Sequence, residues 1–144
     1  LEPYPISSEI YNKLNFHTLI NSASDTFLEL HTSDWEEEVF ISENFTLYKT
    51  QNKIQNFISK KKFDVIYFDA FSPEKQTEMW TVEVFEKCFN LLNKDGFLIT
   101  YCAKGIFRRT LKHVGFEVIS LDGPPGKRQM TRANKSTSQK SSQK

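Results

Sequence analysis

Residues 63–73 read FDVIYFDAFSP, and this stretch decides the fold. Val65–Phe68 form a continuous apolar run, which predicts a β-strand over Phe63–Phe68 that is covered on both faces and central in its sheet. Asp69 follows the strand directly, and the chain then enters a loop that contains Phe71. In open α/β sheets the ligand site lies beyond the carboxyl ends of the strands, so Asp69 stands where a functional carboxylate is expected.

Helical and strand patterns alternate on both sides of this stretch. Thr81 has the side chain of an N-cap, and Trp80 and Phe85 occupy the two positions of a hydrophobic staple, which predicts a helix there. The alternation after residue 63 predicts an α/β fold, with a mostly parallel sheet and helices on both faces. The other predicted elements are strands at 39–41, 45–48, 97–101, 116–121 and 127–133, and helices near 7–14, 18–30, 53–59 and 104–114.

The chain has 144 residues, which is the length of one domain. Thirteen Phe, five Tyr and two Trp supply bulky side chains for a core. From Lys135 onward the sequence holds only Lys, Ser, Thr and Gln. We therefore predict one domain over residues 1–134 and a disordered polar tail over residues 135–144.

Composition excludes several classes of protein. No apolar run approaches the roughly 20 residues that span a bilayer, and the first residues lack the layout of a signal peptide, so we expect a cytoplasmic protein without a membrane partner. Cys88 and Cys102 are the only cysteines, and no Cys/His group has metal-ligand spacing. Two buried free thiols and no bound metal are predicted.

Several charged residues are candidates for a site, and each has a structural alternative. Asp69 is either functional or a turn-starting or helix-capping residue, and spacing alone leaves both open. Glu2 either ends a strand or lies on the surface beside a terminus. Six basic residues would contact phosphates if they gather on one side, although such a cluster is also typical of a solvated face; they are Arg108, Arg109, Lys112, Lys127, Arg128 and Arg132.

Residues 63–81 resemble the methyltransferase domain of the MnmC type, where the corresponding stretch reads approximately D-x-x-x-D-(A/G)-F-(A/S)-P-x-K-x-P-E-M-W. Further blocks are similar to that family in order and spacing: TYCAKG at 100–105, RRTL at 108–111, GFEV at 115–118 and GKRQM at 126–130. Residues 1–5 resemble the family's short block at the end of its second strand. The resemblance is strongest over residues 63–133.

The resemblance implies a Rossmann-like, S-adenosylmethionine-dependent enzyme that acts on the wobble uridine in the anticodon loop of certain tRNAs. The reaction methylates the primary amine of 5-aminomethyl-2-thiouridine and gives 5-methylaminomethyl-2-thiouridine. Some members carry an FAD-dependent oxidase domain behind the methyltransferase. The polar tail after Met130 is similar to the stand-alone version, so no FAD is expected.

Substrate roles follow from the same resemblance. Asp69 would be the catalytic residue, because a carboxylate can accept a hydrogen bond from the amine and help to carry its proton. Phe71, Pro73, Lys127 and Arg128 would bind the substrate. Phe71 is a candidate stacking surface for the extruded uracil ring, and a core or loop-anchoring Phe is an equal alternative.

Cofactor roles are implied for three residues. Glu2 would accept hydrogen bonds from the ribose hydroxyls, a task that needs two acceptor oxygens. Gln51 stands near the place of the acid that contacts the adenine in related sites. Asp69, at the end of its strand, would also face the cofactor.

One departure from the family pattern concerns glycine. A loop of the E-x-G-x-G-x-G kind normally follows the first strand, but none of the five glycines here follows an amino-terminal strand. Close backbone approach to a cofactor requires residues without a β-carbon. We therefore expect a fold that is incomplete at its amino terminus, from either a longer protein or an inactive remnant. The alternatives to a tRNA methyltransferase are a non-catalytic RNA-binding remnant and a methyltransferase for a small-molecule amine.

Overall fold

A computed structural model describes residues 1–20 and 23–136, and the chain divides into two compact units, Leu1–Phe57 and Ile58–Lys144. Most of the predicted polar tail, from residue 137 onward, lies outside the described residues. In the described ranges, no helix has the length and apolar character needed to cross a membrane.

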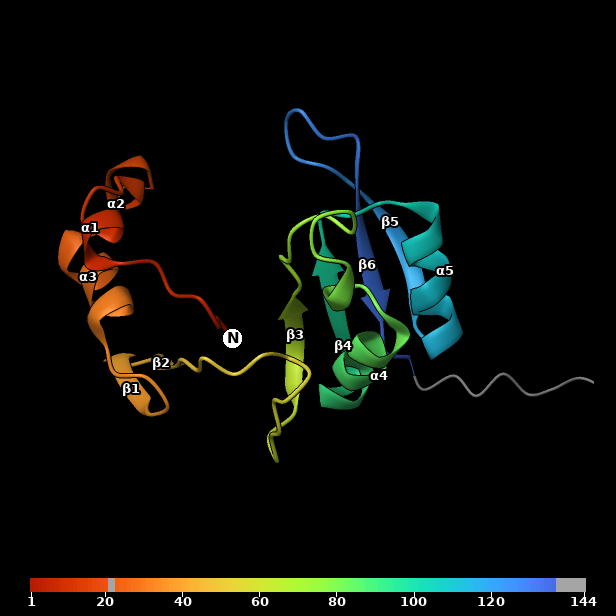
Figure 1. Cartoon of the computed structure of the whole chain (residues 1–144), viewed down its shortest axis with the longest axis horizontal. Helices are drawn as coiled ribbons and strands as arrows, with labels where there is room; N and C mark the ends of the chain where they lie inside the picture. Colours follow the sequence, from red (N-terminus) through yellow and green to blue (C-terminus); the bar gives the residue numbers. More distant parts are fainter. Residues whose placement is uncertain (21–22, 137–144) are drawn as a thin grey trace, which may run out of the picture. The chain divides into compact units, whose positions relative to one another are not determined.

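The first unit combines short helices with a β-hairpin (Figure 1). The hairpin pairs two antiparallel strands, Val39 lying opposite Leu47, as the apolar runs on either side of residues 42–44 predict. Leu1–Pro5 form no strand, but Glu2 N donates to Thr50 O at 2.9 Å. The elements of this unit are α1 (Ser8–Tyr11), α2 (Phe16–Leu19), α3 (Ser24–Thr32), β1 (Glu38–Ser42) and β2 (Phe45–Tyr48).

Two helix predictions in this unit are wrong. The pattern over 18–30 does not form one helix, because α2 ends at Leu19 and Ala23 has extended backbone (φ −65°, ψ 133°) before α3. Residues 21–24 read NSAS, and Asn and Ser favour caps over helix interiors because their side chains compete for backbone groups. Residues 53–59 form a single turn. Ile54 is buried there but Ile58 is 89% exposed, so little packing stabilises a longer helix.

The second unit is a four-stranded sheet in the order β3-β4-β6-β5. The strands are β3 (Phe63–Tyr67), β4 (Leu92–Thr100), β5 (Glu117–Asp122) and β6 (Gln129–Asn134). β3 and β4 are parallel, and β6 is antiparallel to both β4 and β5. Three of the four strands therefore run in one direction, and the fourth returns between two of them.

β3 does not lie centrally in this sheet. Among the described residues only β4 pairs with it, and Tyr67 is 81% exposed. The prediction of a central strand covered on both faces is wrong for the described part of this unit. No residue of Phe63–Tyr67 is buried, and an apolar run carries no signal about which strands lie beside it in the plane.

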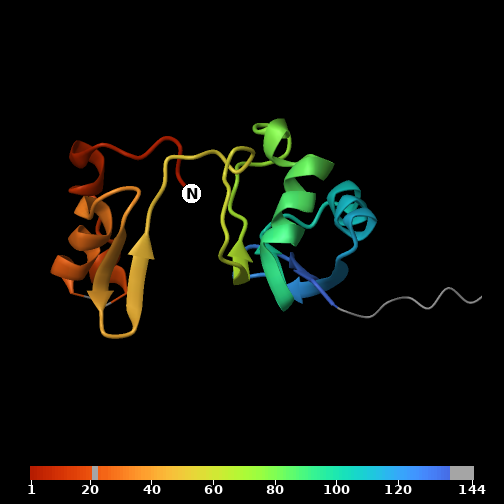
Figure 2. The ribbon, with the colours of Figure 1, turned by 90° about the horizontal axis from the view of Figure 1, so that it is seen from below.

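Two crossover helices cover one face of the sheet (Figure 2). They are α4 (Val82–Leu91), preceded by the short 3-10 helix η1 (Thr77–Met79), and α5 (Gly105–Val114). Each connects parallel strands that progress in the same direction across the sheet, and right-handed crossovers then put both helices on the same side. The predicted helices on both faces are therefore not found in the described part of this unit, residues 58–136.

The helix ends follow the sequence signals. Thr81 accepts from Val84 N as the N-cap of α4, and Trp80 packs against Phe85 with ring centroids 6.2 Å apart, as predicted. Gly115 ends α5 with φ 111°, a left-handed conformation that a residue with a β-carbon adopts only at a cost.

A single core fills the space between helices and sheet. Phe85, Leu98, Leu111 and Ala133 have 0% exposure, and both cysteines are buried and free, as predicted. Burial raises the pKa of Cys88 to about 12, so its thiol stays protonated and unreactive. Lys135, assigned to the tail by composition, still belongs to this body: its Nζ donates to the carbonyls of Phe89 and Leu92 at 2.8 Å.

Candidate functional site

Asp69 lies at the carboxyl end of β3. Tyr67 is opposite Ile99, and Phe68 N still donates to Ile99 O at 2.8 Å, so the chain leaves the sheet at Asp69. The side chain is exposed, and its carboxylate has no hydrogen-bond partner among the described residues. No helix begins there, since the next one, η1, has Gln76 as its N-cap. The helix-capping alternative is therefore wrong.

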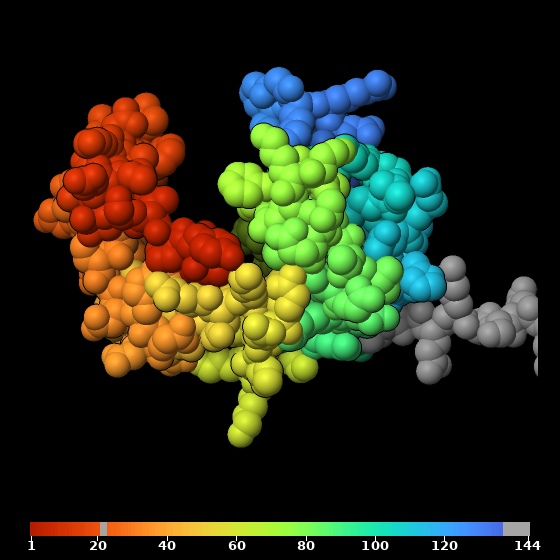
Figure 3. Space-filling view, viewed as in Figure 1, coloured from red at the N-terminus to blue at the C-terminus, as the bar shows by residue number. Residues whose placement is uncertain are grey.

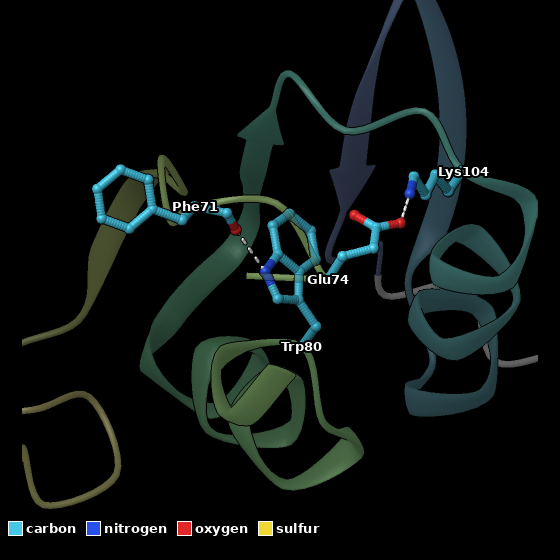
Figure 4. Close-up of polar contacts among 4 residues, drawn as sticks. All are labelled: Phe71, Glu74, Trp80 and Lys104. Carbon is cyan, nitrogen blue, oxygen red and sulfur yellow. Dashed lines mark hydrogen bonds and ion pairs between the residues drawn. The ribbon is translucent and has the colours of Figure 1, made fainter. Parts of the chain in front are cut away.

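The loop after Asp69 is fastened through its backbone (Figure 4). Trp80 Nε1 donates to Phe71 O at 2.8 Å, and Phe71 N donates to Gln76 Oε1 at 3.0 Å. The hydroxyl of Tyr101, which follows β4, donates to Ala70 O at 2.8 Å. Two consecutive peptide groups beyond Asp69 are thus held by three side chains, two from the ends of η1 and one from the residue after β4.

The ring of Phe71 projects away from these contacts. It is 71% exposed, and Figure 4 shows it turned away from Trp80. The alternative of a core or loop-anchoring Phe is wrong for the side chain. The ring is exposed, and only the backbone of Phe71 takes part in the hydrogen bonds of the loop. Pro73, two residues further on, is half-buried. The loop therefore offers a free aromatic face close to the free carboxylate.

Charges of both signs surround this loop. Glu74 forms an ion pair with Lys104, the N-cap residue of α5 (Figure 4). Burial raises the pKa of Tyr101, with smaller contributions from the charges of Cys102 and Asp69. The phenol therefore remains a neutral hydrogen-bond donor at neutral pH. Lys127 Nζ lies 3.9 Å from the centroid of the Tyr101 ring.

Lys127 and Arg128 lie in the loop between β5 and β6, here called the basic loop (residues 123–128). Both side chains are exposed, and Figure 3 shows this loop in blue at one end of the second unit. Because β5 runs parallel to β3, the basic loop begins at the same edge of the sheet as Asp69, where both strands have their carboxyl ends. The contact between Lys127 and Tyr101 joins the two loops.

The six basic residues do not gather on one side. Arg108 reaches the helix-covered face, where its guanidinium donates to the hydroxyls of Thr131 and Ser120 at 3.0 and 3.2 Å. Arg132 follows Thr131 and points to the other face, with its guanidinium carbon 3.9 Å from the Phe97 ring centroid. Arg109 and Lys112 are exposed on α5. The hypothesis of one six-residue phosphate surface is therefore wrong.

Glu2 and Gln51 come together within the first unit. The backbone hydrogen bond from Glu2 N to Thr50 O places Glu2 beside the segment that contains Gln51. One carboxylate oxygen of Glu2 accepts from Tyr4 N at 2.9 Å, and the carboxylate has no other hydrogen bond among the described residues. A carboxylate and an amide side chain that are far apart in the sequence thus lie on neighbouring backbone segments.

Glu36 fixes the Gln51 segment and was not anticipated from the sequence. Its backbone is left-handed (φ 64°), and its carboxylate accepts from Gln51 N and the Tyr48 hydroxyl at 3.0 Å each. Hydrogen bonds from Thr50, Gln51 and Tyr48 hold the pKa of Glu36 below its ordinary value. A positive φ at Glu36 and hydrogen bonds to residues 12 and 15 positions away produce no pattern in the neighbouring sequence, so no sequence signal could have identified this residue.

A sequence profile described as S-adenosyl-L-methionine-dependent methyltransferase matches residues 8–136, which is most of the chain. The chain belongs to this family. The family resemblance drawn from residues 63–133 is thereby confirmed, together with its α/β methyltransferase fold.

Curated relatives of this methyltransferase chain carry one name. The protein called tRNA 5-methylaminomethyl-2-thiouridine biosynthesis bifunctional protein MnmC from Cupriavidus necator is 45% identical over 71 residues, which is 49% of this chain and 11% of the relative. The protein of that name from Marinomonas is 40% identical over 68 residues, or 47% of this chain and 10% of the relative. The chain thus spans about a tenth of the length of these relatives.

The fold also has a solved counterpart. The crystal structure of MNMC2 from Aquifex aeolicus superposes with a TM-score of 0.62 at 24% identity, covering 94% of this chain and 40% of that one. At this identity the likeness concerns the fold alone. It extends over both units of the methyltransferase chain.

The family implies S-adenosylmethionine as the cofactor. Glu2 and Gln51 offer the acceptors and amide that suit the sugar and base of a nucleoside. All five glycines belong to the second unit, so the first unit, which contains Glu2 and Gln51, supplies no glycine of its own. The described residues contain no group of three or more His, Cys, Asp or Glu that could hold a metal ion.

Tyr101 is the residue of the second unit that sequence reasoning left without a role. It stood inside the TYCAKG block, but nothing in its neighbours indicated a contact. A signal did exist, since Asp69 and Tyr101 each come at the end of a predicted strand. In the structure, Tyr67 and Ile99 are partners in parallel strands, and each of the two residues comes two positions later. The carboxyl ends of adjacent parallel strands meet at one edge of a sheet.

Proposed function

We propose that this chain is part of an enzyme that methylates the 5-aminomethyl group of the wobble 2-thiouridine in tRNA and gives 5-methylaminomethyl-2-thiouridine. The observation that carries the proposal is the exposed, unpaired Asp69 carboxylate at the carboxyl end of β3, within a stretch that resembles the MnmC type. The curated relatives, whose name includes this nucleoside, add support.

Asp69 suits a reaction at a primary amine. Such an amine is largely protonated at neutral pH, and a protonated nitrogen has no lone pair for attack. The carboxylate of Asp69 accepts a hydrogen bond from the amine, orients its lone pair and takes up its proton. Bound S-adenosylmethionine supplies an electrophilic methyl group. Because the loop beyond Asp69 is held by three side-chain hydrogen bonds, the carboxylate stands on a fixed support, which favours positioning as a main contribution.

The neighbouring groups suit a splayed-out nucleotide. The exposed ring of Phe71 stacks on the uracil, with Pro73 beside it, since single-stranded bases are commonly held on aromatic faces. Lys127 and Arg128 of the basic loop contact phosphates of the anticodon loop. In the first unit, Glu2 would bind the ribose of the cofactor and Gln51 its adenine edge.

Methyl transfer from labelled S-adenosylmethionine to tRNA that carries the unmethylated amine tests the proposal. The assay uses this chain and, in parallel, a longer version that includes any coding sequence upstream of Leu1. Asp69→Asn, which removes the charge and keeps the size, is expected to lower kcat by about 10²- to 10⁴-fold. The matched control is Asp122→Asn, an exposed carboxylate at the end of β5, which should leave kcat unchanged.

The alternatives give different results in this assay. A non-catalytic RNA-binding remnant would bind tRNA in a salt-dependent way, transfer no methyl group and be indifferent to Asp69→Asn. A methyltransferase for a small-molecule amine would be active without RNA. An inactive long version would refute the tRNA proposal.

A further inference from the structure

We infer that Tyr101 is a positioning residue that joins the basic loop to the Asp69 loop, its hydroxyl holding the peptide group after Ala70 and its ring carrying the Lys127 ammonium. The inference rests on the proposed function and extends it to a residue that acts through the two loops it contacts.

The hydroxyl acts on one peptide group. Ala70 O and Phe71 N belong to the same peptide unit, and both ends are held, the oxygen by Tyr101 at 2.8 Å and the N–H by Gln76 at 3.0 Å. A planar peptide fixed at both ends cannot rotate, so the backbone one residue beyond Asp69 has a defined direction. Without the Tyr101 hydroxyl, the unit is held at its N–H alone.

The ring faces the second loop. Lys127 Nζ lies 3.9 Å from the ring centroid, within the range of a cation–π contact. The loop that carries Lys127 is tight: Lys127 N donates to Pro124 O at 2.9 Å, and a β-carbon at Gly123 would collide with the Lys127 carbonyl. The close turn therefore brings the ammonium group over Tyr101.

The partners of Tyr101 indicate a role in the site and not in the core. Its side chain is half-buried, and the loop it holds contains the exposed Asp69 and Phe71. Burial raises the pKa of its phenol, which keeps the hydroxyl a donor toward the Ala70 carbonyl in the neutral range. The two segments that it touches are the ones assigned to the amine and to phosphate.

Tyr101→Phe tests the inference, because it removes the hydroxyl and keeps the ring over which Lys127 lies. In the longest active form of the protein, kcat for methyl transfer should fall about tenfold while KM for tRNA stays within about twofold. Amide hydrogen exchange at Phe71, read by NMR, should accelerate. The matched control is Tyr67→Phe, whose 81% exposed ring has no hydrogen bond among the described residues and which should change neither quantity.

Unchanged exchange at Phe71 would overturn the inference, and so would faster exchange with an unchanged kcat. A rise in KM with constant kcat would also count against it, because it would indicate a binding role. If the wild-type protein transfers no methyl group to tRNA, the proposed function fails and the catalytic part of the inference fails with it. The exchange measurement still decides separately whether Tyr101 holds the loop.

Discussion

The two units differ in how they are held together. In the second, large apolar side chains such as Phe85, Leu98 and Leu111 are fully buried. In the described part of the first, Thr50 and Ile54 are the only buried residues, and α1, α2 and α3 bury none. Burial of apolar area is the main source of stability, so the second unit should dominate the folding free energy.

Ring contacts and hydrogen bonds take the place of a core in the first unit. Tyr11 stacks on His31 with centroids 4.9 Å apart, Phe27 meets His31 edge-on at 4.8 Å, and Lys49 Nζ donates to two carbonyls at the end of α3. Such contacts contribute individually small free energies, of about 0.5–1.5 kcal/mol. The lesson is that Asp69 stands on a rigid support, whereas Glu2 and Gln51 stand on a weaker one.

One tryptophan in each unit makes the comparison measurable. Trp35 belongs to the first unit, beneath Lys49, and Trp80 belongs to the second, against Phe68 and Phe107. Because the chain has two tryptophans, Trp35→Phe and Trp80→Phe each leave fluorescence from one unit.

The largest effect is expected from the core. Leu98→Ala should lower the unfolding free energy of the second unit by about 3 kcal/mol, through lost burial and the cavity left behind. Urea unfolding followed by Trp80 fluorescence measures it. The matched variant in the first unit, Leu19→Ala, removes a 69% exposed side chain and should change the Trp35 transition by less than about 0.5 kcal/mol. Equal effects would contradict the contrast between the units.

Helix caps offer an intermediate test with opposite signs. Thr81→Ala removes the side chain that accepts from Val84 N and should destabilise the second unit by about 1 kcal/mol. Helix α3 has Ala23 at its N-cap and no side-chain cap bond, so Ala23→Asp should stabilise the first unit by up to about 1 kcal/mol. The same urea titrations report both changes, and a gain of stability from Thr81→Ala would refute the assignment of this cap.

The smallest expected effect is the dependence of the first unit's stability on acid, through Glu36. The pKa of Glu36 is lowered in the folded state. At pH values above its unfolded pKa of 4.5, the ionised carboxylate therefore stabilises the first unit. That contribution is lost as the pH falls below 4.5 through the folded pKa. Glu36→Gln should reduce the acid dependence of the Trp35 transition and leave that of the Trp80 transition unchanged. An identical acid response in the wild type and the variant would show that Glu36 does not stabilise the unit.

Signals carried by adjacent residues predicted their elements well. Thr81 with Trp80 and Phe85 predicted the start of α4, because capping depends on neighbours within a few positions. The helix predicted near 104–114 agrees with α5, which Gly115 ends. The position of Asp69 directly after β3 could be predicted for the same reason. The helix predicted over 18–30 failed because apolar periodicity alone does not register the end of α2 at Leu19 or the extended backbone of Ala23.

The sequence by itself determined that this chain has strand β3, an acid at its end and helices with defined caps, because these features depend on local backbone preferences and apolar spacing. Tertiary structure decided that β3 pairs with β4 alone among the described residues, that β6 separates β4 from β5, and that Arg108 and Arg132 serve opposite faces. It also brought Glu2 to Thr50 and Tyr101 to Ala70. Strand order and these long-range contacts arise from pairing between distant segments, and a short stretch of sequence does not specify its distant partners.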